Sequence, residues 1–339
     1  MEILVTGGTG YIGSHTVVEL LQAGHSVVIA DNLCHSDRSV LDGIRAITGQ
    51  IPVFYETDCC DRAALDRLFQ RHPKLDAVIH FAALKAVNES ELLPLAYYAN
   101  NLGALVTLLQ AMQAHRVNQI VFSSSCTVYG TPGNPPVTEQ SPIQPATSPY
   151  GATKQMCERI LQDAVHADPS LSATALRYFN PIGAHESGLI GEKPQGVPQN
   201  LLPYVTETAA GIRRELRIFG NDYPTPDGTC IRDFIHVSDL ARAHVCALEH
   251  MRHVPAGWRT YNIGTGRGTS VRELVDTFIR TTGASVPFRY EARRPGDIGQ
   301  IWADPSLAER ELGWKSVKTL EETLLSAWRW QQHITNLEK

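Results

Sequence analysis

The sequence predicts an α/β protein with a doubly wound parallel sheet and a smaller second domain of mixed α/β structure. Three observations predict this fold class. Strand and helix patterns alternate through the first half of the 339 residues, a glycine-rich turn joins the first strand to the first helix, and Pro- and Gly-rich loops dominate after about residue 180. Such alternation is typical of a parallel sheet with helices on both faces.

Composition places the chain among globular proteins and excludes several partners. Hydrophobic residues make up 43%, enough for one large domain or two unequal ones. The formal net charge is -5 and no long Lys/Arg run occurs, so we expect neither a nucleic-acid nor a membrane partner. No apolar segment approaches the roughly 18 residues that span a bilayer, and the first strand occupies the N-terminus, so we expect a cytoplasmic location.

Cysteine and histidine spacing predicts no metal centre. The seven cysteines form no C-x-x-C pair, and the thirteen histidines form no H-E-x-x-H. We therefore expect reduced thiols and no catalytic metal.

The first strand and helix predict a dinucleotide site. The apolar run 2–6 leads into Gly7-Gly8-Thr9-Gly10-Tyr11-Ile12-Gly13, and a helical pattern follows. Glycines at these positions let the backbone turn tightly and approach a pyrophosphate at the helix N-terminus. The next strand, 26–30, ends at Asp31, where a carboxylate would accept hydrogen bonds from an adenosine ribose and repel a 2′-phosphate. This pattern favours NAD over NADP.

Further elements follow in alternation. We expect strands near 52–55, 76–82, 118–123 and 172–178, and helices near 61–71, 94–115 and 148–167. Polar residues cluster where the strands end, as expected for a sheet whose ligands bind at its carboxyl edge. These residues are Asp31, Asp58, Lys85 and Ser123 to Ser125. We predict a dinucleotide-binding domain over 1–180 and a second domain over 181–339, with segments near 233–264 able to pack back onto the first.

The segment Ser148-Pro149-Tyr150-Gly151-Ala152-Thr153-Lys154 predicts a catalytic base. Ser148 suits an N-cap and Pro149 the first helical position, so Tyr150 and Lys154 lie one turn apart on one face. Tyrosine has a pKa near ~10, and a phenolate base near neutral pH requires a lower value. We expect the Lys154 ammonium and the helix N-terminus to lower the pKa of Tyr150.

Together, Gly7-x-x-Gly10-x-x-Gly13, Asp31, Ser125 and Tyr150-x-x-x-Lys154 resemble an extended short-chain dehydrogenase/reductase with a Rossmann domain. Longer segments resemble the UDP-glucose 4-epimerase family, and the resemblance covers nearly the whole chain. They are 80–87, 123–130, 176–185, 218–225, 232–237 and 293–297.

The resemblance implies reversible 4-epimerisation of UDP-glucose and UDP-galactose through a 4-keto sugar, with tightly bound NAD. It implies Tyr150, Lys154 and Ser125 as catalytic residues. The implied cofactor contacts are Gly7, Gly10, Tyr11, Ile12, Gly13, Asp31, Asn32, Ser36, Asp58, Cys59, Phe81, Lys85, Asn100, Ser123, Tyr150, Lys154 and Tyr178. The implied UDP-sugar contacts, in the second domain and the cleft, are Ser125, Tyr150, Asn180, Asn200, Leu201, Arg217, Phe219, Arg232, Arg294, Asp297 and Ile301.

Two positions depart from the family pattern. Cys126 replaces a common alanine, with no chemistry that we can assign. Ile301 stands where a tyrosine narrows the sugar pocket of strict UDP-galactose epimerases, so the resemblance implies access for UDP-N-acetylated hexosamines. It also implies a homodimer formed through the helices near 94–115 and 148–167.

Alternatives to epimerisation stay open. A nucleotide-sugar 4,6-dehydratase would need an Asp-Glu pair after the catalytic hydroxyl residue, whereas Cys126 and Thr127 occupy those positions here. A nucleotide-sugar decarboxylase or a uronic-acid epimerase would use the same fold. A catalytically silent NAD sensor would have no need for Ser125, Tyr150 and Lys154 together.

Overall fold

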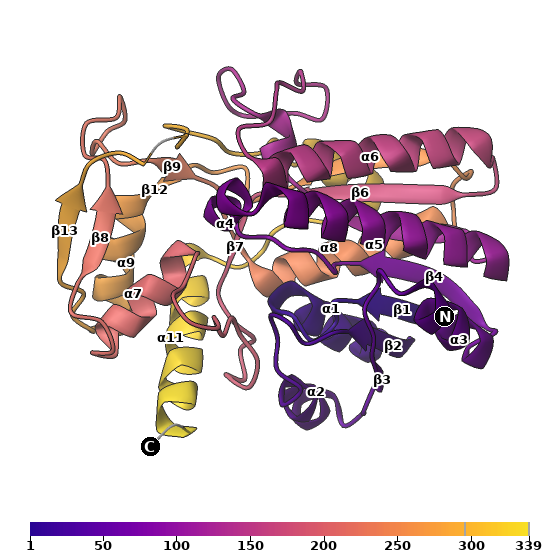
Figure 1. The fold of residues 1–339 in the computed structure, drawn as a ribbon. Helices are drawn as coiled ribbons and strands as arrows, with labels where there is room; N and C mark the ends of the chain where they lie inside the picture. The colour runs from indigo at the N-terminus through magenta and orange to yellow at the C-terminus, as the bar shows by residue number, and fades with distance from the viewer. Residues whose placement is uncertain (295, 338–339) are drawn as a thin grey trace.

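A seven-stranded sheet forms the larger half of the molecule (Figure 1). In the computed structural model, which describes residues 1–294 and 296–337, every strand pairing in this sheet is parallel. The strand order is β11-β6-β5-β4-β1-β2-β3. Their bounds are β1 Glu2–Thr6, β2 Ser26–Asp31, β3 Val53–Glu56, β4 Leu75–His80, β5 Gln119–Ser125, β6 Ser172–Tyr178 and β11 Trp258–Ile263. The order reverses at β1, which places a ligand-binding crevice between β1 and β4 at the carboxyl edge.

Helices cover both faces of this sheet because its side chains alternate between them. Ile3 and Val5 pack in one buried core, whereas Leu4 packs in the other. The first core includes side chains of α1 (Tyr11–Gln22), α2 (Val40–Thr48), α8 (Val237–Met251) and α10 (Ser306–Leu312). The second includes α3 (Arg62–Arg71), α5 (Pro94–His115) and α6 (Pro149–Ala167). The short helix α4 (Val87–Leu92) precedes α5.

The smaller half has its own apolar core around three helices and a two-stranded parallel sheet (Figure 1). Its strands are β8 (Leu216–Phe219) and β13 (Phe288–Glu291), and its helices are α7 (Leu201–Ala209), α9 (Val271–Thr282) and α11 (Leu320–Leu337). Two further small sheets pair β7 (Asn180–Ile182) with β10 (Phe234–His236) and β9 (Ile231–Arg232) with β12 (Thr269–Ser270).

The predicted fold class is confirmed by this architecture. Strands β1 and β6 and helix α5 have the bounds that the sequence predicts. The sequence misses the short helices α2, α4, α7 and α10 and the longer α11. Strand β11 pairs with β6, and α8 packs in the core of the large sheet, so the chain returns to the first half after residue 236. The domain division at residue 180 stays a prediction. Within 1–294 and 296–337, no helix is both long and apolar enough to cross a membrane.

Candidate active site

The turn after β1 has glycines where any side chain would collide. Gly7 has a φ of +70°, and a Cβ there would lie 2.8 Å from the Ala82 nitrogen. A Cβ on Gly13 would lie 2.2 Å from the Gly7 carbonyl oxygen, so this glycine lets α1 pack against the turn. A Cβ on Gly10 would meet only the Gly7 oxygen, at 3.2 Å, and no side chain caps α1. The turn therefore fits a dinucleotide pyrophosphate, which would approach the backbone at Gly10.

Asp31 lies beside this turn at the end of β2 and is almost fully buried. Its Oδ2 accepts a hydrogen bond from the Thr9 backbone nitrogen at 3.1 Å, and its Oδ1 accepts from the Leu33 nitrogen and the Ser36 hydroxyl. The Asn32 side chain accepts from the Cys34 nitrogen and so shapes the same loop. The structure brings Asp31, Asn32 and Ser36 together with the glycine turn, as a ribose-binding site requires.

Other predicted cofactor positions lie at the carboxyl edge of the sheet or on neighbouring loops. Asp58 accepts from the Cys60 nitrogen at 2.8 Å, and the buried Cys59 thiol has its pKa raised to about 12 by burial. The Phe81 ring packs against the His244 ring at 4.7 Å. The Tyr11 hydroxyl donates to the Gly183 oxygen, and the Asn100 side chain donates to that of Asn101. The Tyr178 hydroxyl is hydrogen-bonded to the His244 Nε2, and Ile12 packs against the core.

Helix α6 begins as its sequence predicts. Ser148 is the N-cap, and its hydroxyl accepts a hydrogen bond from the Gly151 nitrogen at 3.1 Å. Pro149 occupies the first turn. One turn beyond Tyr150, the buried Lys154 donates from Nζ to the Ser123 carbonyl oxygen at 2.6 Å and lies 5.8 Å from the Tyr150 ring centroid. The pair is therefore held against the carboxyl end of β5.

The expected lowering of the Tyr150 pKa is wrong for the chain by itself. Burial raises the pKa of Tyr150 well above its ordinary value, and the hydrogen bond with Ser125 lowers it only in part. Burial also lowers the pKa of Lys154, to about 8, because desolvation disfavours the charged form of each group. Ionising Tyr150 near neutral pH therefore requires further positive charge in the site.

Ser125 joins strand β5 to the short 3-10 helix η1 (Cys126–Tyr129). Its hydroxyl accepts hydrogen bonds from the Thr127 nitrogen at 3.2 Å and the Thr127 hydroxyl at 3.0 Å. The Ser125 hydroxyl lies close enough to Tyr150 to lower the pKa of that phenol in part, against the effect of burial. The structure thus brings Ser125, Tyr150 and Lys154 into one site.

Predicted substrate residues form a second group on β7, β9 and the segment after β13. Asn180 donates its backbone nitrogen to the Asp233 oxygen, and its buried Oδ1 has no hydrogen-bond partner among the described residues. The Arg232 guanidinium lies 3.6 Å from Asp297, and the Arg294 guanidinium lies 3.9 Å from the Phe219 ring centroid. Arg217 is exposed on β8. Pro295, within the quoted 293–297 motif, lies outside the described residues.

Ile301 is in an apolar core. It is 4% exposed and packs with Val128, Phe179 and their neighbours, and Cys126 packs against the same cluster. Burial raises the pKa of the Cys126 thiol to about 12, so this thiol stays neutral near neutral pH. Both departures from the family pattern therefore meet at one apolar cluster beside Ser125.

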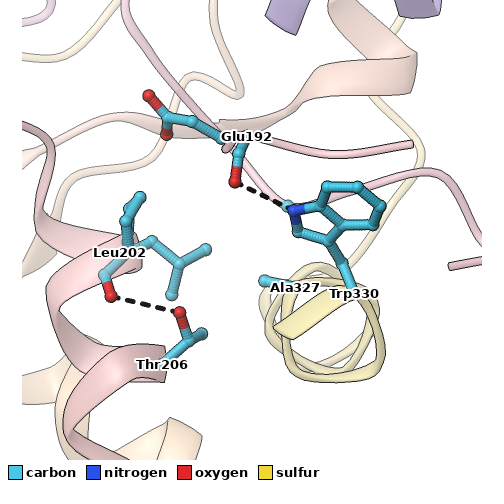
Figure 2. Close-up of a pocket in the computed structure, with 7 residues that line it drawn as sticks. Glu192, Leu202, Thr206, Ala327 and Trp330 are labelled. Atoms are coloured by element: carbon cyan, nitrogen blue, oxygen red, sulfur yellow. Dashed lines mark hydrogen bonds between the residues drawn. The ribbon is translucent and has the colours of Figure 1, made fainter. Parts of the chain in front are cut away.

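Sequence reasoning missed Glu192, which joins the two halves. Its Oε1 accepts hydrogen bonds from Lys85 Nζ at 3.2 Å and from Asn200 Nδ2 at 2.6 Å. Asn200 is the N-cap of α7, and Leu201, another predicted substrate residue, is the first residue of that helix. Figure 2 shows its backbone oxygen accepting from the Trp330 indole, at 2.9 Å. The small cavity lined in part by Glu192 and Trp330, about 20 Å³, is too small for a nucleotide. No sequence signal links Lys85 and Glu192, because they are 107 residues apart.

Metal-binding groups are absent from the described ranges: no three His, Cys, Asp or Glu side chains in them are arranged to hold an ion. All seven cysteines are free.

Comparisons with known proteins agree with one another, the family model over residues 3–264 and the relatives over nearly the whole chain. The NAD dependent epimerase/dehydratase family model matches residues 3–264. The UDP-glucose 4-epimerase of Bacillus subtilis (strain 168) is 53% identical over 336 residues, 99% of this chain and 98% of the relative. A UDP-glucose-4-epimerase structure from Stenotrophomonas maltophila, with bound NAD and formylated UDP-arabinopyranose, has a TM-score of 0.97 and 50% identity, covering 99% of both chains. One from Bifidobacterium longum, with NAD+ and UDP, has a TM-score of 0.96 and 46% identity, again over 99% of both chains.

Proposed function

The chain belongs to the NAD dependent epimerase/dehydratase family, and from that premise we propose that it interconverts UDP-glucose and UDP-galactose by inverting C4 of the sugar, with tightly bound NAD. The observation that carries the proposal is the Tyr150–Lys154 pair, with Lys154 Nζ bonded to the Ser123 carbonyl oxygen at the carboxyl edge of the sheet that holds the glycine turn. Relatives about half identical over nearly the full chain support the substrate.

Residues that would hold NAD come from the larger half. The glycine turn would receive the pyrophosphate, and Asp31 would accept hydrogen bonds from the adenosine ribose. When bound, NAD supplies the hydride acceptor and, afterwards, the hydride donor for C4 of the sugar, and its oxidised ring is a cation. A positive charge of this kind is what the buried Tyr150 phenol requires to ionise.

Tyr150 acts as the base. Its phenolate takes the proton of the sugar 4-hydroxyl, directly or through Ser125, as the C4 hydrogen leaves as hydride. Lys154, fixed by the Ser123 carbonyl, stabilises the phenolate. The same phenol returns the proton when hydride is added to the opposite face of the 4-keto sugar, so protons and electrons balance over the cycle.

The smaller half would hold the nucleotide. Arg232 and Arg294 can each bond two diphosphate oxygens, and the buried Oδ1 of Asn180, which has no partner among the described residues, is available as an acceptor. Strong contacts to the nucleotide would retain the 4-keto intermediate, whereas weak contacts to the sugar would leave the sugar free to rotate and present its other face.

The direct test is to mix the purified protein with UDP-galactose, without added NAD, and to follow UDP-glucose formation. We expect conversion to an equilibrium mixture, because the cofactor co-purifies. Absence of UDP-glucose, with or without added NAD, would contradict the proposed function.

A 4,6-dehydratase is disfavoured by the two residues after Ser125. The Cys126 thiol is buried with a raised pKa, and the Thr127 hydroxyl donates to Ser125, so neither supplies a carboxylate. An elimination reaction would lack its acid and base at these positions. Appearance of a 4-keto-6-deoxy product would overturn this argument.

Ile301 supports a wider substrate range. An isoleucine at this position occupies less space than the tyrosine of strict UDP-galactose epimerases, so we expect UDP-N-acetylglucosamine to be accepted as well. Because Ile301 packs in the core with Val128 and Phe179, we expect it to leave space for the N-acetyl group and not to contact the sugar itself, which departs from the contact predicted at this position. Comparing kcat/KM for the plain and N-acetylated substrates tests this, and complete refusal of the latter would contradict it.

We also propose a cytoplasmic homodimer formed through α5 and α6. Large apolar side chains are exposed on and beside these helices, including Leu92 and Leu95, each 80% exposed, and Met156, 45% exposed. Apolar surface of this kind favours a protein interface. Sedimentation of the wild-type protein and of a Leu95→Glu variant tests the interface, and a monomeric wild type would contradict it.

A further inference from the structure

A buried carboxylate lies directly behind the catalytic pair. Glu158 follows Lys154 by four residues and Tyr150 by eight, so the three side chains lie along one face of α6. The Glu158 side chain is 3% exposed. A carboxylate so removed from water must be compensated by hydrogen bonds and an opposite charge.

One carboxylate fastens α6 to two neighbouring strands, β5 and β6. Glu158 Oε1 accepts from the Ser124 hydroxyl at 2.5 Å and from Arg177 Nε at 2.9 Å, and its Oε2 accepts from Arg177 Nη2 at 2.7 Å. Ser124 on β5 and Arg177 on β6 are direct register partners. The bidentate geometry fixes direction as well as distance. Any shift of α6 along the sheet would break all three bonds.

The same guanidinium also holds η1, the segment that Ser125 caps. Arg177 Nη1 donates to the Tyr129 hydroxyl at 2.9 Å, and that hydroxyl donates to Asn262 Oδ1 at 2.7 Å. Asn262 in turn donates to the Val137 oxygen at 2.8 Å. The network therefore reaches the base-bearing helix on one side and the Ser125 turn on the other.

We propose that Glu158 is a positioning residue for the reaction: clamped by Arg177 and Ser124, it sets the register of Tyr150 and Lys154 against Ser123 and Ser125 and places a negative charge beside the Lys154 ammonium. The inference rests on the proposed function, since it concerns the same proton transfer. Glu158 touches neither ligand site and acts through Lys154 and Tyr150.

The groups around Lys154 support the electrostatic part of the proposal, that Glu158 places a negative charge beside the Lys154 ammonium. Its neighbours on α6 are Tyr150, Cys157 and Glu158, while His80 faces it from β4. Burial lowers the pKa of His80 to about 3 and raises that of Cys157 to about 11, so both are neutral at working pH. Tyr178 on β6 and Cys126 on η1, which face Tyr150, also have raised pKa values. Burial lowers the pKa of Lys154, and Cys157 and then Glu158, which is held in an ion pair with Arg177, raise it in part.

The test compares pH profiles of kcat and KM for UDP-galactose in holoenzyme variants. We expect Glu158→Gln to lower kcat roughly tenfold or more with KM nearly unchanged, because displaced catalytic groups cost rate rather than binding. The alkaline limb of its kcat–pH profile should move to lower pH, because Lys154 loses a nearby negative charge that favours its protonated form. Ser124→Ala keeps the charge and removes one bond, so its kcat should fall less and its alkaline limb should stay in place.

Controls separate this role from plain destabilisation. Glu158→Gln/Arg177→Met removes both buried charges, which proteins often tolerate, and should show a smaller alkaline shift than Glu158→Gln, because losing the guanidinium offsets losing the carboxylate. Asp163→Asn, in an exposed pair on the same helix, should match the wild type. Of the two Glu158 variants, Glu158→Gln decides the matter: an unmoved alkaline limb or a wild-type kcat in it would overturn the proposal. If neither Glu158 variant folds, a wild-type kcat in Ser124→Ala would overturn the proposal. An inactive wild type would instead refute the proposed function.

Discussion

The two halves of the molecule hold their polar side chains in different ways. In the larger half, Asp31 and Lys154 are buried and already bonded to the backbone of neighbouring segments. In the smaller group of predicted residues, Arg217 is exposed, Arg294 lies over the Phe219 ring, and Asn180 keeps a buried oxygen without a partner among the described residues. The larger half is thus organised before any ligand binds, whereas the smaller half presents groups for a ligand to engage.

This contrast suits a retained cofactor and an exchanging substrate. A preorganised site spends little free energy on ordering its side chains when a ligand binds, so it can hold that ligand tightly. A site completed by its ligand gives up part of its binding energy to ordering and releases the ligand more readily. Four substitutions test whether the halves divide the work in this way.

The largest effect should come from Tyr150→Phe. Removing the base should lower turnover by about 10²- to 10⁴-fold, while NAD and UDP still bind, because the phenol acts on the proton rather than on the nucleotide. Steady-state kinetics and calorimetry of UDP binding measure both. The matched control is Tyr290→Phe, whose exposed hydroxyl bonds only Arg272 among the described residues, and which should keep full activity. Turnover unchanged in Tyr150→Phe would remove this residue from its role.

Arg232→Met tests the smaller half. Losing a charged hydrogen-bond donor to a diphosphate costs about 1.5–3 kcal/mol, or roughly 10- to 100-fold in KM, with little change in kcat. Arg267→Met removes an arginine from an exposed pair with Glu273 and should leave KM unaltered. If Arg232→Met lowered kcat but not KM, this half would be contributing to the chemistry, and the comparison would fail.

Gly13→Ala tests whether the larger half is organised in advance. The new Cβ would lie 2.2 Å from the Gly7 oxygen, so the turn must shift, at a cost of about 1–3 kcal/mol of stability. We expect a lower Tm and less NAD per purified subunit. A Cβ on Gly133 would meet no atom within 4 Å, which makes Gly133→Ala the neutral reference. Full NAD content in Gly13→Ala would show that the turn tolerates adjustment.

Glu192→Ala should have the smallest effect and measures how the halves are coupled. It removes two hydrogen bonds, to Lys85 and Asn200, each worth about 0.5–1.5 kcal/mol. We expect weaker retention of both NAD and UDP, by up to about tenfold each. Glu186→Ala, which loses only an exposed pair with Lys318, is the control. If only one ligand weakened, Glu192 would belong to one half and would not link them.

Local features of the site are predictable because their partners are near in sequence. The glycine turn, the Ser148 cap and the Tyr150–Lys154 spacing each depend on contacts within about one helical turn. The missed helix α2 shows the opposite case. Gly43 in its interior lowers helix propensity, yet it is required because a Cβ there would lie 2.7 Å from Ile190, a residue of a distant loop.

The sequence by itself determined the order of strand, turn and helix, the glycine turn and the spacing of Tyr150 and Lys154 on one face of α6. Only the tertiary structure decided how those residues ionise and what holds them. Burial raises the pKa of Tyr150 against the effect that its neighbours along the helix predict. Glu158 meets Arg177 and Ser124 only after α6 packs on the sheet, and Tyr129 meets Asn262 across 133 residues. Periodicity and capping are encoded within short windows, whereas desolvation and charge pairing depend on which distant segments exclude water together.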